Sequence, residues 1–366
     1  MSPLDVFSGL WAPSLKAAMV GMQFLISSLP LGPIRAWMPD SGTVWSDLTI
    51  LLAEDPGFGT SSFQGMPLRG SGSEPWFWSL KWSRFTAQHW EVPLVAVAAY
   101  LLAIPLLKWH VAKYGKWDVR NVAFYWNAGL SLFSWCGVFA CVPVLLDGLV
   151  ENGFYFTTCA PAKWYGNDLS GFFVMLFVYS KLAELMDTVL LLLAQKPVIA
   201  LQWWHHSTVL LYCWHSYSAS IATGIWFAAM NYSVHSVMYG YFAVTATKYR
   251  KLVTPFAIFI TLAQLLQMLV GMYVTIKAVL YQAQGQECHV NKTNSVLGLL
   301  MYLSYFVLFF KLFIDNYCLQ AKKSEPSVPA KKRPTTMQLV RKVTEDTLKD
   351  ASPSMIFCEF EETKEQ

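Results

Sequence analysis

Seven stretches of the chain are long and apolar enough to cross a lipid bilayer as helices. One crossing needs about 20 mostly apolar residues. The stretches cover roughly residues 93–112, 122–146, 169–194, 197–217, 221–245, 253–281 and 295–318. The connections between them are short, so consecutive helices should be antiparallel, and an open sheet would leave unpaired backbone groups in lipid. The pattern therefore predicts an all-α polytopic membrane protein with seven transmembrane helices.

The two ends of the chain differ from this seven-helix region. Residues 1–92 are rich in Pro, Gly, Ser and Trp, and we expect an N-terminal extension that is partly disordered or lies on the membrane surface. Its apolar patch, Ala17–Pro30, fits a surface helix best; an eighth span and a cleaved signal peptide are the alternatives. Residues 93–318 form the predicted seven-helix domain. Residues 319–366 form a polar tail, with one short helix expected near Met337–Leu348.

Composition points to the same class of protein. The 366 residues are 55% hydrophobic, 16% aromatic and 14% charged, whereas soluble globular chains are about 25% charged. This excludes a disordered chain and argues against a soluble enzyme. The net charge is +4, and acidic residues nearly balance the basic ones in the C-terminal tail, so nucleic acid is not an expected partner. The seven cysteines form no CxxC pair, so no zinc site is predicted.

Basic residues in the short loops predict the orientation, because cytosolic loops carry the excess of Lys and Arg. The even-numbered loops carry only Lys163 and Lys292. The basic residues around the odd-numbered loops are Lys108, Lys113, Lys116, Arg120, Lys196, Lys248, Arg250 and Lys251. We therefore place the odd-numbered loops and the C-terminus in the cytosol, and the N-terminus in the lumen or outside the cell.

Two features of the even-numbered loops agree with this orientation. Asn291-Lys-Thr293 is an N-glycosylation sequon, and Asn291 is the predicted acceptor. Cys159 and Cys288 also fall in predicted lumenal loops, where disulfides persist. We expect these two cysteines to pair; two free thiols are the alternative.

The third span carries charges inside the membrane. Lys181, Glu184, Asp187 and Thr188 fall within an arc of about 120° on a helix of 3.6 residues per turn. Ionisable groups in a span cost about 2.5–3.5 kcal/mol each on insertion scales, so they usually mark function. The alternative is a network within the helix that only neutralises itself.

Polar stripes also mark the next three spans. The stripe residues are Gln202, His205 and His206 in the fourth span, Asn231, His235, Met238, Tyr239 and Tyr241 in the fifth, and Thr261, Gln264 and Gln267 in the sixth. Taken singly, each stripe is more often a polar contact between helices. Two adjacent histidines without a nearby ligand cluster make a poor metal site, so no metal is predicted.

The depth of the four stripes favours a shared function. With the predicted orientation and 1.5 Å of rise per residue, Asp187, His205, His235, Gln264 and Gln267 all lie roughly 12–21 Å below the cytosolic surface. Four polar faces at one depth predict a single chamber that is entered from the cytosol. The apolar remainder of the spans could line a closed tunnel for a hydrocarbon chain.

The stripes match, in order and spacing, the motifs of a known family. Over about residues 93–318 the chain resembles the very-long-chain fatty acid elongases, the ELO family of membrane 3-ketoacyl-CoA synthases. The family motifs KxxExxDT, HxxHH, NxxxHxxMYxYY and TxxQxxQ correspond to residues 181–188, 202–206, 231–242 and 261–267. Gln202 replaces the first histidine of its motif, and Phe242 replaces a tyrosine. Gln202 donates and accepts hydrogen bonds but does not titrate.

The resemblance implies a fold and a reaction. Six of the seven helices should form a barrel around a closed acyl tunnel. A long-chain acyl-CoA and malonyl-CoA should condense to a 3-ketoacyl-CoA, CoA and carbon dioxide, with no further cofactor, through a histidine acyl-enzyme in a ping-pong mechanism. The run from Trp203 to Tyr217 looks most like the branch of the family that acts on saturated and monounsaturated acyl groups.

The resemblance also suggests roles for the motif residues. We expect His205 to be the nucleophile and His235 its partner or a second covalent site, with His206 and Gln202 orienting it and Asn231 hydrogen-bonding a reacting oxygen. The predicted substrate-binding residues are Lys181, Glu184, Asp187, Thr188, Met238, Tyr239, Thr261, Gln264 and Gln267. The cations at the cytosolic mouth that could bind CoA phosphates are Lys196, Lys248, Arg250 and Lys251.

The cellular setting follows from the same resemblance. It implies a location in the endoplasmic reticulum membrane. It also implies that a ketoreductase, a dehydratase and an enoyl reductase are partners for the other steps of the elongation cycle. A homodimer is compatible with it. The chain ends with only Lys364 in place of the family's lysine-based retrieval signal. A di-iron desaturase or hydroxylase is rejected, because the chain has only seven histidines. A receptor or transporter explains seven spans, but not four polar stripes at one depth.

Overall fold

The part of the chain that the structure describes is entirely helical in its regular elements. The structure is a computed structural model, and it describes residue 63, residue 77 and residues 79–319. The expectations for Ala17–Pro30 and Met337–Leu348 lie outside these residues. The α-helices are α4 Ser79–Gln88, α5 Glu91–Tyr114, α6 Arg120–Cys159, α7 Asp168–Ala183, α8 Leu185–Leu193, α9 Ala200–Ser218, α10 Gly224–Thr245, α11 Arg250–Val253, α12 Ala257–Ala283 and α13 Lys292–Phe313. The short helical turns are η1 Ala162–Trp164, η2 Thr254–Phe256 and η3 Ile314–Leu319.

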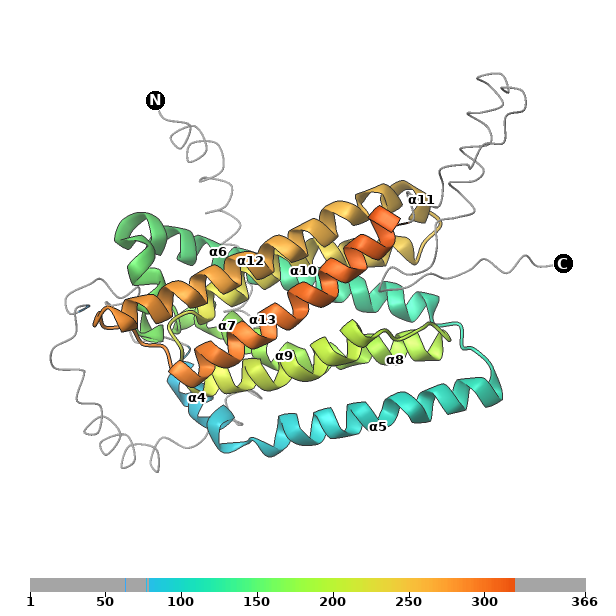
Figure 1. Cartoon of the computed structure of the whole chain (residues 1–366). Coiled ribbons are helices and arrows are strands. Elements are labelled where there is room, and N and C mark those ends of the chain that lie inside the picture. Colours follow the sequence, from blue (N-terminus) through green and yellow to red (C-terminus); the bar gives the residue numbers. More distant parts are fainter. Residues whose placement is uncertain (1–62, 64–76, 78, 320–366) are drawn as a thin grey trace, which may run out of the picture.

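The long helices lie side by side in one elongated bundle (Figure 1). Helix α6 packs against α7 and α10, α12 packs against α10 and α13, and α13 and α7 both contact α9. Helix α5 lies along the edge of the bundle against α8 and α9. The short helix α4 packs against α7 and α9, so ordered packing begins before residue 93.

Four helical segments of the described residues are long and apolar enough to cross a membrane. They are Glu91–Tyr114, Arg120–Cys159, Arg250–Ala283 and Lys292–Tyr317. The expected spans at 169–194, 197–217 and 221–245 do not reach this standard of length and apolarity, because α7 and α8 are short and α9 and α10 carry polar side chains. The total of seven spans therefore stays a prediction.

Two helix boundaries differ from the sequence-based expectation. The stretch 122–146 belongs to α6, which continues to Cys159 and bends at Gly153, where φ is 82°. The stretch 169–194 was expected as one helix, and that was wrong, because α7 and α8 are separated at Glu184. There the Asp187 N–H donates to the Glu184 carbonyl (3.1 Å), a tighter turn than the α-helix, of the kind often found at functional positions.

The two ends of the bundle hold different sets of loops (Figure 1). At one end, the Trp117 N–H donates to the Leu193 carbonyl (2.9 Å), which joins the α5–α6 loop to the end of α8. At the other end a disulfide links Cys159 to Cys288, the pair expected from the sequence. Two backbone hydrogen bonds hold the α9–α10 turn at this disulfide end. The His289 N–H donates to the Cys159 carbonyl, and the Ala222 N–H donates to the His289 carbonyl.

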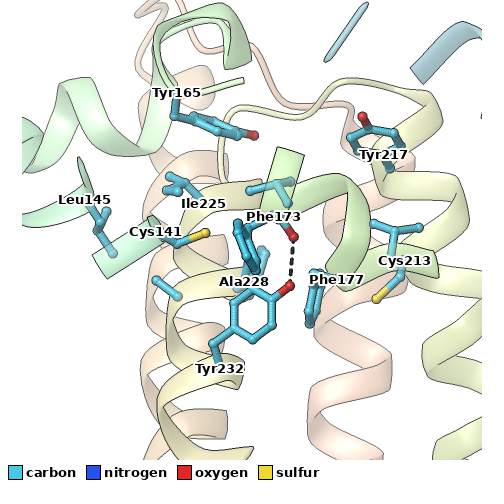
Figure 2. Packing of buried hydrophobic residues seen from close by; sticks show 14 of the residues in the cluster. Cys141, Leu145, Tyr165, Phe173, Phe177, Cys213, Tyr217, Ile225, Ala228 and Tyr232 are labelled. Carbon is cyan, nitrogen blue, oxygen red and sulfur yellow. Dashed lines mark hydrogen bonds between the residues drawn. The ribbon is translucent and has the colours of Figure 1, made fainter. Parts of the chain in front are cut away.

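Close packing of α6 against α10 forms one wall of the bundle. A Cβ on Gly137 of α6 would lie 2.5 Å from the ring of Tyr232 on α10, so only glycine admits that ring. The Tyr232 hydroxyl donates to the Phe173 carbonyl (2.8 Å), which fastens the same helix to α7 (Figure 2). This packing fixes the position of α10, and with it the polar residues His235 and Tyr239 that follow Tyr232 on the same helix.

The first helical turn of α13 is capped by the predicted glycosylation site. The Asn291 Oδ1 accepts hydrogen bonds from the N–H groups of Thr293 (2.8 Å) and Asn294 (3.3 Å). We expect Asn291→Ala to cost about 1 kcal/mol, because it leaves these donors without the cap. That corresponds to about 2–4 °C in the melting temperature measured in detergent.

Asn291→Asp is the matched control for this prediction. Both variants destroy the sequon and so remove any glycan equally, whereas aspartate keeps a capping oxygen. Asn291→Asp should therefore melt close to the unglycosylated wild type. Equal losses in the two variants would show that the cap contributes nothing.

Candidate functional site

A buried ion pair lies at the junction of α7 and α8. The Lys181 ammonium is 2.6 Å from Glu184 Oε1, and the two side chains are 1% and 4% exposed. The same ammonium donates to Asn231 Oδ1 on α10 (3.2 Å), and the Asn231 amide donates to His235 Nε2 (3.0 Å). Lys181 also lies 4.5 Å from the ring centre of Phe177. A continuous line of polar contacts therefore runs from the charged turn to an imidazole on α10.

Asp187 ties three helices together one turn further on. Its Oδ1 accepts from the indole N–H of Trp126 on α6 (2.6 Å), and its Oδ2 accepts from the hydroxyl of Tyr239 on α10 (2.9 Å). The residue is 3% exposed. Because both carboxylate oxygens have donors, this aspartate is a structural anchor of the chamber.

Gln202 occupies the position where the family motif has a histidine. Its Nε2 donates to the Thr188 hydroxyl (3.1 Å) and lies 2.9 Å from His206 Nε2. Thr188 in turn contacts the Tyr100 hydroxyl (2.8 Å). The glutamine thus joins α9 to α8 and, through Thr188, to α5. It can hold the His206 ring in place without titrating itself.

His205 lies in a different environment from His206, although the residues are adjacent. His206 is 4% exposed, whereas His205 is half-buried. The His205 ring lies 4.8 Å from the ring of Tyr305 on α13 and 5.3 Å from that of His206. His205 is therefore the more exposed imidazole of this pair.

Two cavities adjoin at His205 and His235. The first, about 1080 Å³ of space free of protein atoms with open solvent included, extends to Ser79, Gly166 and Ile221 at the disulfide end. The second, about 760 Å³ counted in the same way, extends toward the opposite end. The side chains that line both cavities are His205, His235, Gln264 and Phe309. The two imidazoles and one amide therefore lie at the meeting point of the cavities.

Most of the motif residues line one cavity or the other. Asn231 and Gln267 line the first, and the second has its own set. That set consists of Glu184, Asp187, Gln202, His206, Met238, Tyr239, Tyr241, Phe242 and Thr261. The Gln264 amide donates to the Met238 sulfur (3.2 Å), and the Thr261 hydroxyl donates to the Ala257 carbonyl within its own helix (3.1 Å).

Four predicted residues are not brought into this arrangement. Lys196, Lys248, Arg250 and Lys251 line neither cavity. They lie in the α8–α9 connection and at and around α11, beyond the ends of the helices that carry the polar stripes. Any contact with a bound CoA would therefore be made outside the two cavities.

Several residues of the site were missed by the sequence analysis. Trp126, Tyr100 and Tyr305 contact the motif residues from α6, α5 and α13. Each is one aromatic residue among many in an apolar span, so no spacing or charge signal distinguished it. Within the described residues, no three or more His, Cys, Asp or Glu side chains are grouped so that they could hold a metal ion.

Comparison with known proteins establishes the family. Residues 85–325 match the GNS1/SUR4 family, ELO, and the chain belongs to this family. Its membership and its long apolar helices identify a multi-pass membrane protein. The resemblance inferred from the four motifs is thereby confirmed.

Similar proteins come from trypanosomes and from a bird. Very long chain fatty acid elongase 4 of Trypanosoma cruzi is 42% identical over 65% of this chain and 83% of its own length. Fatty acid elongase 3 of Trypanosoma brucei brucei is 40% identical over 66% of this chain and 88% of its own length. Very long chain fatty acid elongase 6 of Gallus gallus is 38% identical over 63% of this chain and 86% of its own length.

Proposed function

We propose that this membrane enzyme of fatty acid elongation is an acyltransferase that condenses a long-chain acyl-CoA with malonyl-CoA. The products are a 3-ketoacyl-CoA two carbons longer, free CoA and carbon dioxide. The observation that carries the proposal is that His205 and His235 line both an extended cavity and a second one, which Glu184, Asp187 and Gln202 also line. Such a junction suits a reaction in which an acyl chain lies on one side and a CoA thioester arrives from the other.

The chemistry begins with acyl transfer to the imidazole of His205. Imidazole is a nucleophile that splits one difficult substitution into two easier ones. Its unprotonated nitrogen attacks the thioester carbonyl, the C–S bond breaks, and CoA leaves as the thiol after taking up a proton. The acyl group is then held as an acyl-imidazole, with its hydrocarbon chain in the first cavity.

Malonyl-CoA completes the reaction at the same junction. Its C–C bond to the carboxylate breaks, carbon dioxide leaves, and the electron pair forms an enolate of the thioester. The enolate carbon attacks the acyl-imidazole, the C–N bond breaks, and the departing imidazole nitrogen takes up a proton to restore neutral His205. The amides of Asn231 and Gln264 are the donors that could stabilise the developing oxyanions, with Asn231 held in place by Lys181.

The remaining polar residues position these groups. Gln202 orients His206, and Asp187 holds Tyr239. His235 adjoins the same space as His205 and serves as its partner or as a second covalent site. Lys196, Lys248, Arg250 and Lys251 would contact CoA phosphates beyond the cavities, where cations and phosphates pair well.

The order of helix contacts supports a six-helix barrel around the acyl tunnel. Starting at α6, contacts run to α10, α12, α13, α9, α7 and back to α6. Helix α5 then lies outside this ring. On this proposal α7 with α8, α9 and α10 are membrane spans despite their polar faces, since those faces point to the chamber rather than to lipid.

The proposed setting is the endoplasmic reticulum membrane with the C-terminus in the cytosol. The 3-ketoacyl-CoA product requires a ketoreductase, a dehydratase and an enoyl reductase to complete each cycle. Saturated and monounsaturated acyl groups are the proposed substrates. Of the relatives compared, one from Gallus gallus is named very long chain fatty acid elongase 6.

The test is a two-part assay on the full-length protein purified in detergent. Incubation with palmitoyl-CoA alone should give a protein heavier by one palmitoyl group, measured by intact mass. Addition of labelled malonyl-CoA should discharge this adduct and give a labelled product two carbons longer. Absence of both the adduct and the product would overturn the proposal and leave a transport or binding function for the chamber.

A further inference from the structure

The far end of the first cavity is lined in part by a helix that largely precedes the family match. Helix α4 covers residues 79–88, whereas the match begins at residue 85. Ser79 and Ser83 of α4 nevertheless line the first cavity, together with Ser220 of the α9–α10 turn and Tyr165 and Gly166 of the α6–α7 connection. The wall at this end is therefore supplied in part by a segment that the four motifs do not include.

Hydrogen bonds seat α4 firmly against the bundle. The Ser83 hydroxyl lies 2.7 Å from the Ser220 hydroxyl, and Ser83 is 4% exposed. One turn later the Thr86 hydroxyl lies 2.9 Å from the Tyr179 hydroxyl of α7. The indole of Trp214 on α9 donates to the Thr86 carbonyl (2.8 Å). Helix α4 is thus tied to α7, to α9 and to the α9–α10 turn, and it forms a fixed wall.

The cavity between the imidazoles and this wall can be measured along α9. From His205, the lining residues Val209, Cys213 and Ser216 follow at about one-turn intervals. Ser216 is eleven positions beyond His205, which corresponds to about 16 Å along the helix axis. On the facing helix α10, Gly224 lies eleven positions before His235. Helices α9 and α10 therefore give the same distance between the meeting point of the two cavities and the far end of the first cavity.

The side chains along the cavity change in character with depth. Val174, Val178, Val209 and Phe227 line its middle, whereas hydroxyl groups gather at its end. Figure 2 shows four of the lining residues, with Tyr165 and Tyr217 in the upper part of the view and Phe177 and Cys213 below them. The end hydroxyls already have protein partners, as Ser83 has in Ser220 and Tyr165 has in the Ile221 carbonyl. The end is thus lined by hydroxyl groups rather than by a continuation of the apolar side chains.

We infer that α4 is the end stop of the acyl tunnel and that Ser83 determines the longest acyl chain that is accepted. This inference rests on the proposed function. Backbone bonds in an extended chain advance about 1.2 Å each, so an acyl chain attached at His205 reaches the level of Ser216 after about 14 carbons. The wall at Ser83 lies just beyond, so the preferred primers have roughly 14 to 18 carbons.

The experiment changes the volume at position 83 and records activity against chain length. Full-length wild type, Ser83→Val and Ser83→Leu are assayed with lauroyl-, myristoyl-, palmitoyl- and stearoyl-CoA and labelled malonyl-CoA. The added carbons occupy the last part of the tunnel. We expect Ser83→Leu to lose at least about tenfold in rate with stearoyl-CoA relative to lauroyl-CoA, and Ser83→Val to lose less. The control is Ala87→Leu, which adds bulk at an exposed position of α4 outside the cavity and should keep the wild-type profile.

The outcomes separate this inference from the proposed function. If wild type extends none of the acyl-CoAs, the proposed function fails. If wild type is active and Ser83→Leu lowers all chain lengths equally, or leaves the profile unchanged, the end-stop assignment fails while the proposed function stands. If Ser83→Leu does not purify as a monodisperse protein, the profile of Ser83→Val decides the question by the same criterion.

Discussion

His205→Ala is expected to lose both the palmitoyl adduct and the formation of the extended product. The alanine removes the nitrogen that attacks the thioester, so the covalent route closes and the rate should fall at least about 10³-fold, as for other single members of a covalent catalytic group. The measurements are the intact mass after incubation with palmitoyl-CoA and the yield of labelled product with malonyl-CoA. The apparent melting temperature should change little, because the His205 ring is half-buried and its contacts with His206 and Tyr305 are ring contacts rather than bonds of the buried ion-pair network.

His110→Ala is the control for this prediction. His110 lies on α5 near Tyr114 and Trp117 and lines neither cavity, so its loss should leave the adduct and the product intact. Peptide mapping of the wild-type adduct provides a second check. Cys213 also lines the first cavity, about two turns beyond His205. An adduct on Cys213, or one that persists in His205→Ala, would contradict the assignment of the nucleophile.

Lys181→Met is expected to cause the largest loss of stability among single substitutions in the chamber. It leaves the Glu184 carboxylate, which is 4% exposed, without its cation. Breaking one partner of a buried ion pair costs about 3–5 kcal/mol. The substitution also removes the donor to Asn231, so this hydrogen bond between α7 and α10 is lost. The measurement is thermal unfolding in detergent, which should show a clear fall in the apparent melting temperature.

Two controls identify the buried charge as the cause. Lys181→Met combined with Glu184→Gln removes both charges and should recover a large part of the lost stability, because replacement of both partners avoids an unpaired buried ion. Lys311→Met breaks the pair with Asp315 near the end of α13, where the side chains are 72% and 44% exposed, and should cost less than Lys181→Met because neither charge is buried among the packed helices. Equal effects of Lys181→Met and Lys311→Met would contradict the prediction.

The local pattern of apolar and polar residues was enough to predict much of the fold and the types of residue that form the site. A helix in lipid satisfies its own backbone hydrogen bonds, so the apolar runs alone indicated the helices. The 3.6-residue period placed Lys181, Glu184 and Asp187 on one face, and these side chains are buried together. The order and spacing of the four motifs identified the family, and the sorting of loops predicted the pairing of Cys159 with Cys288.

Other features depended on contacts between residues far apart in the chain. The partners of Lys181 include Asn231, fifty positions away, and Trp126 reaches Asp187 from α6. Neither contact is indicated by a periodic pattern in the sequence, because each depends on how two packed helices are rotated and shifted relative to each other.

The sequence by itself determined the helical class, the family and the set of polar side chains, because hydropathy and period are properties of neighbouring residues. Only the tertiary structure decided that His205 and His235 adjoin two cavities and that α4, outside the motif region, supplies the wall with Ser83. The physical reason is that the shape and length of a cavity are set by the side chains that enter it from several helices. That information is distributed over the whole chain and appears only when the helices are packed.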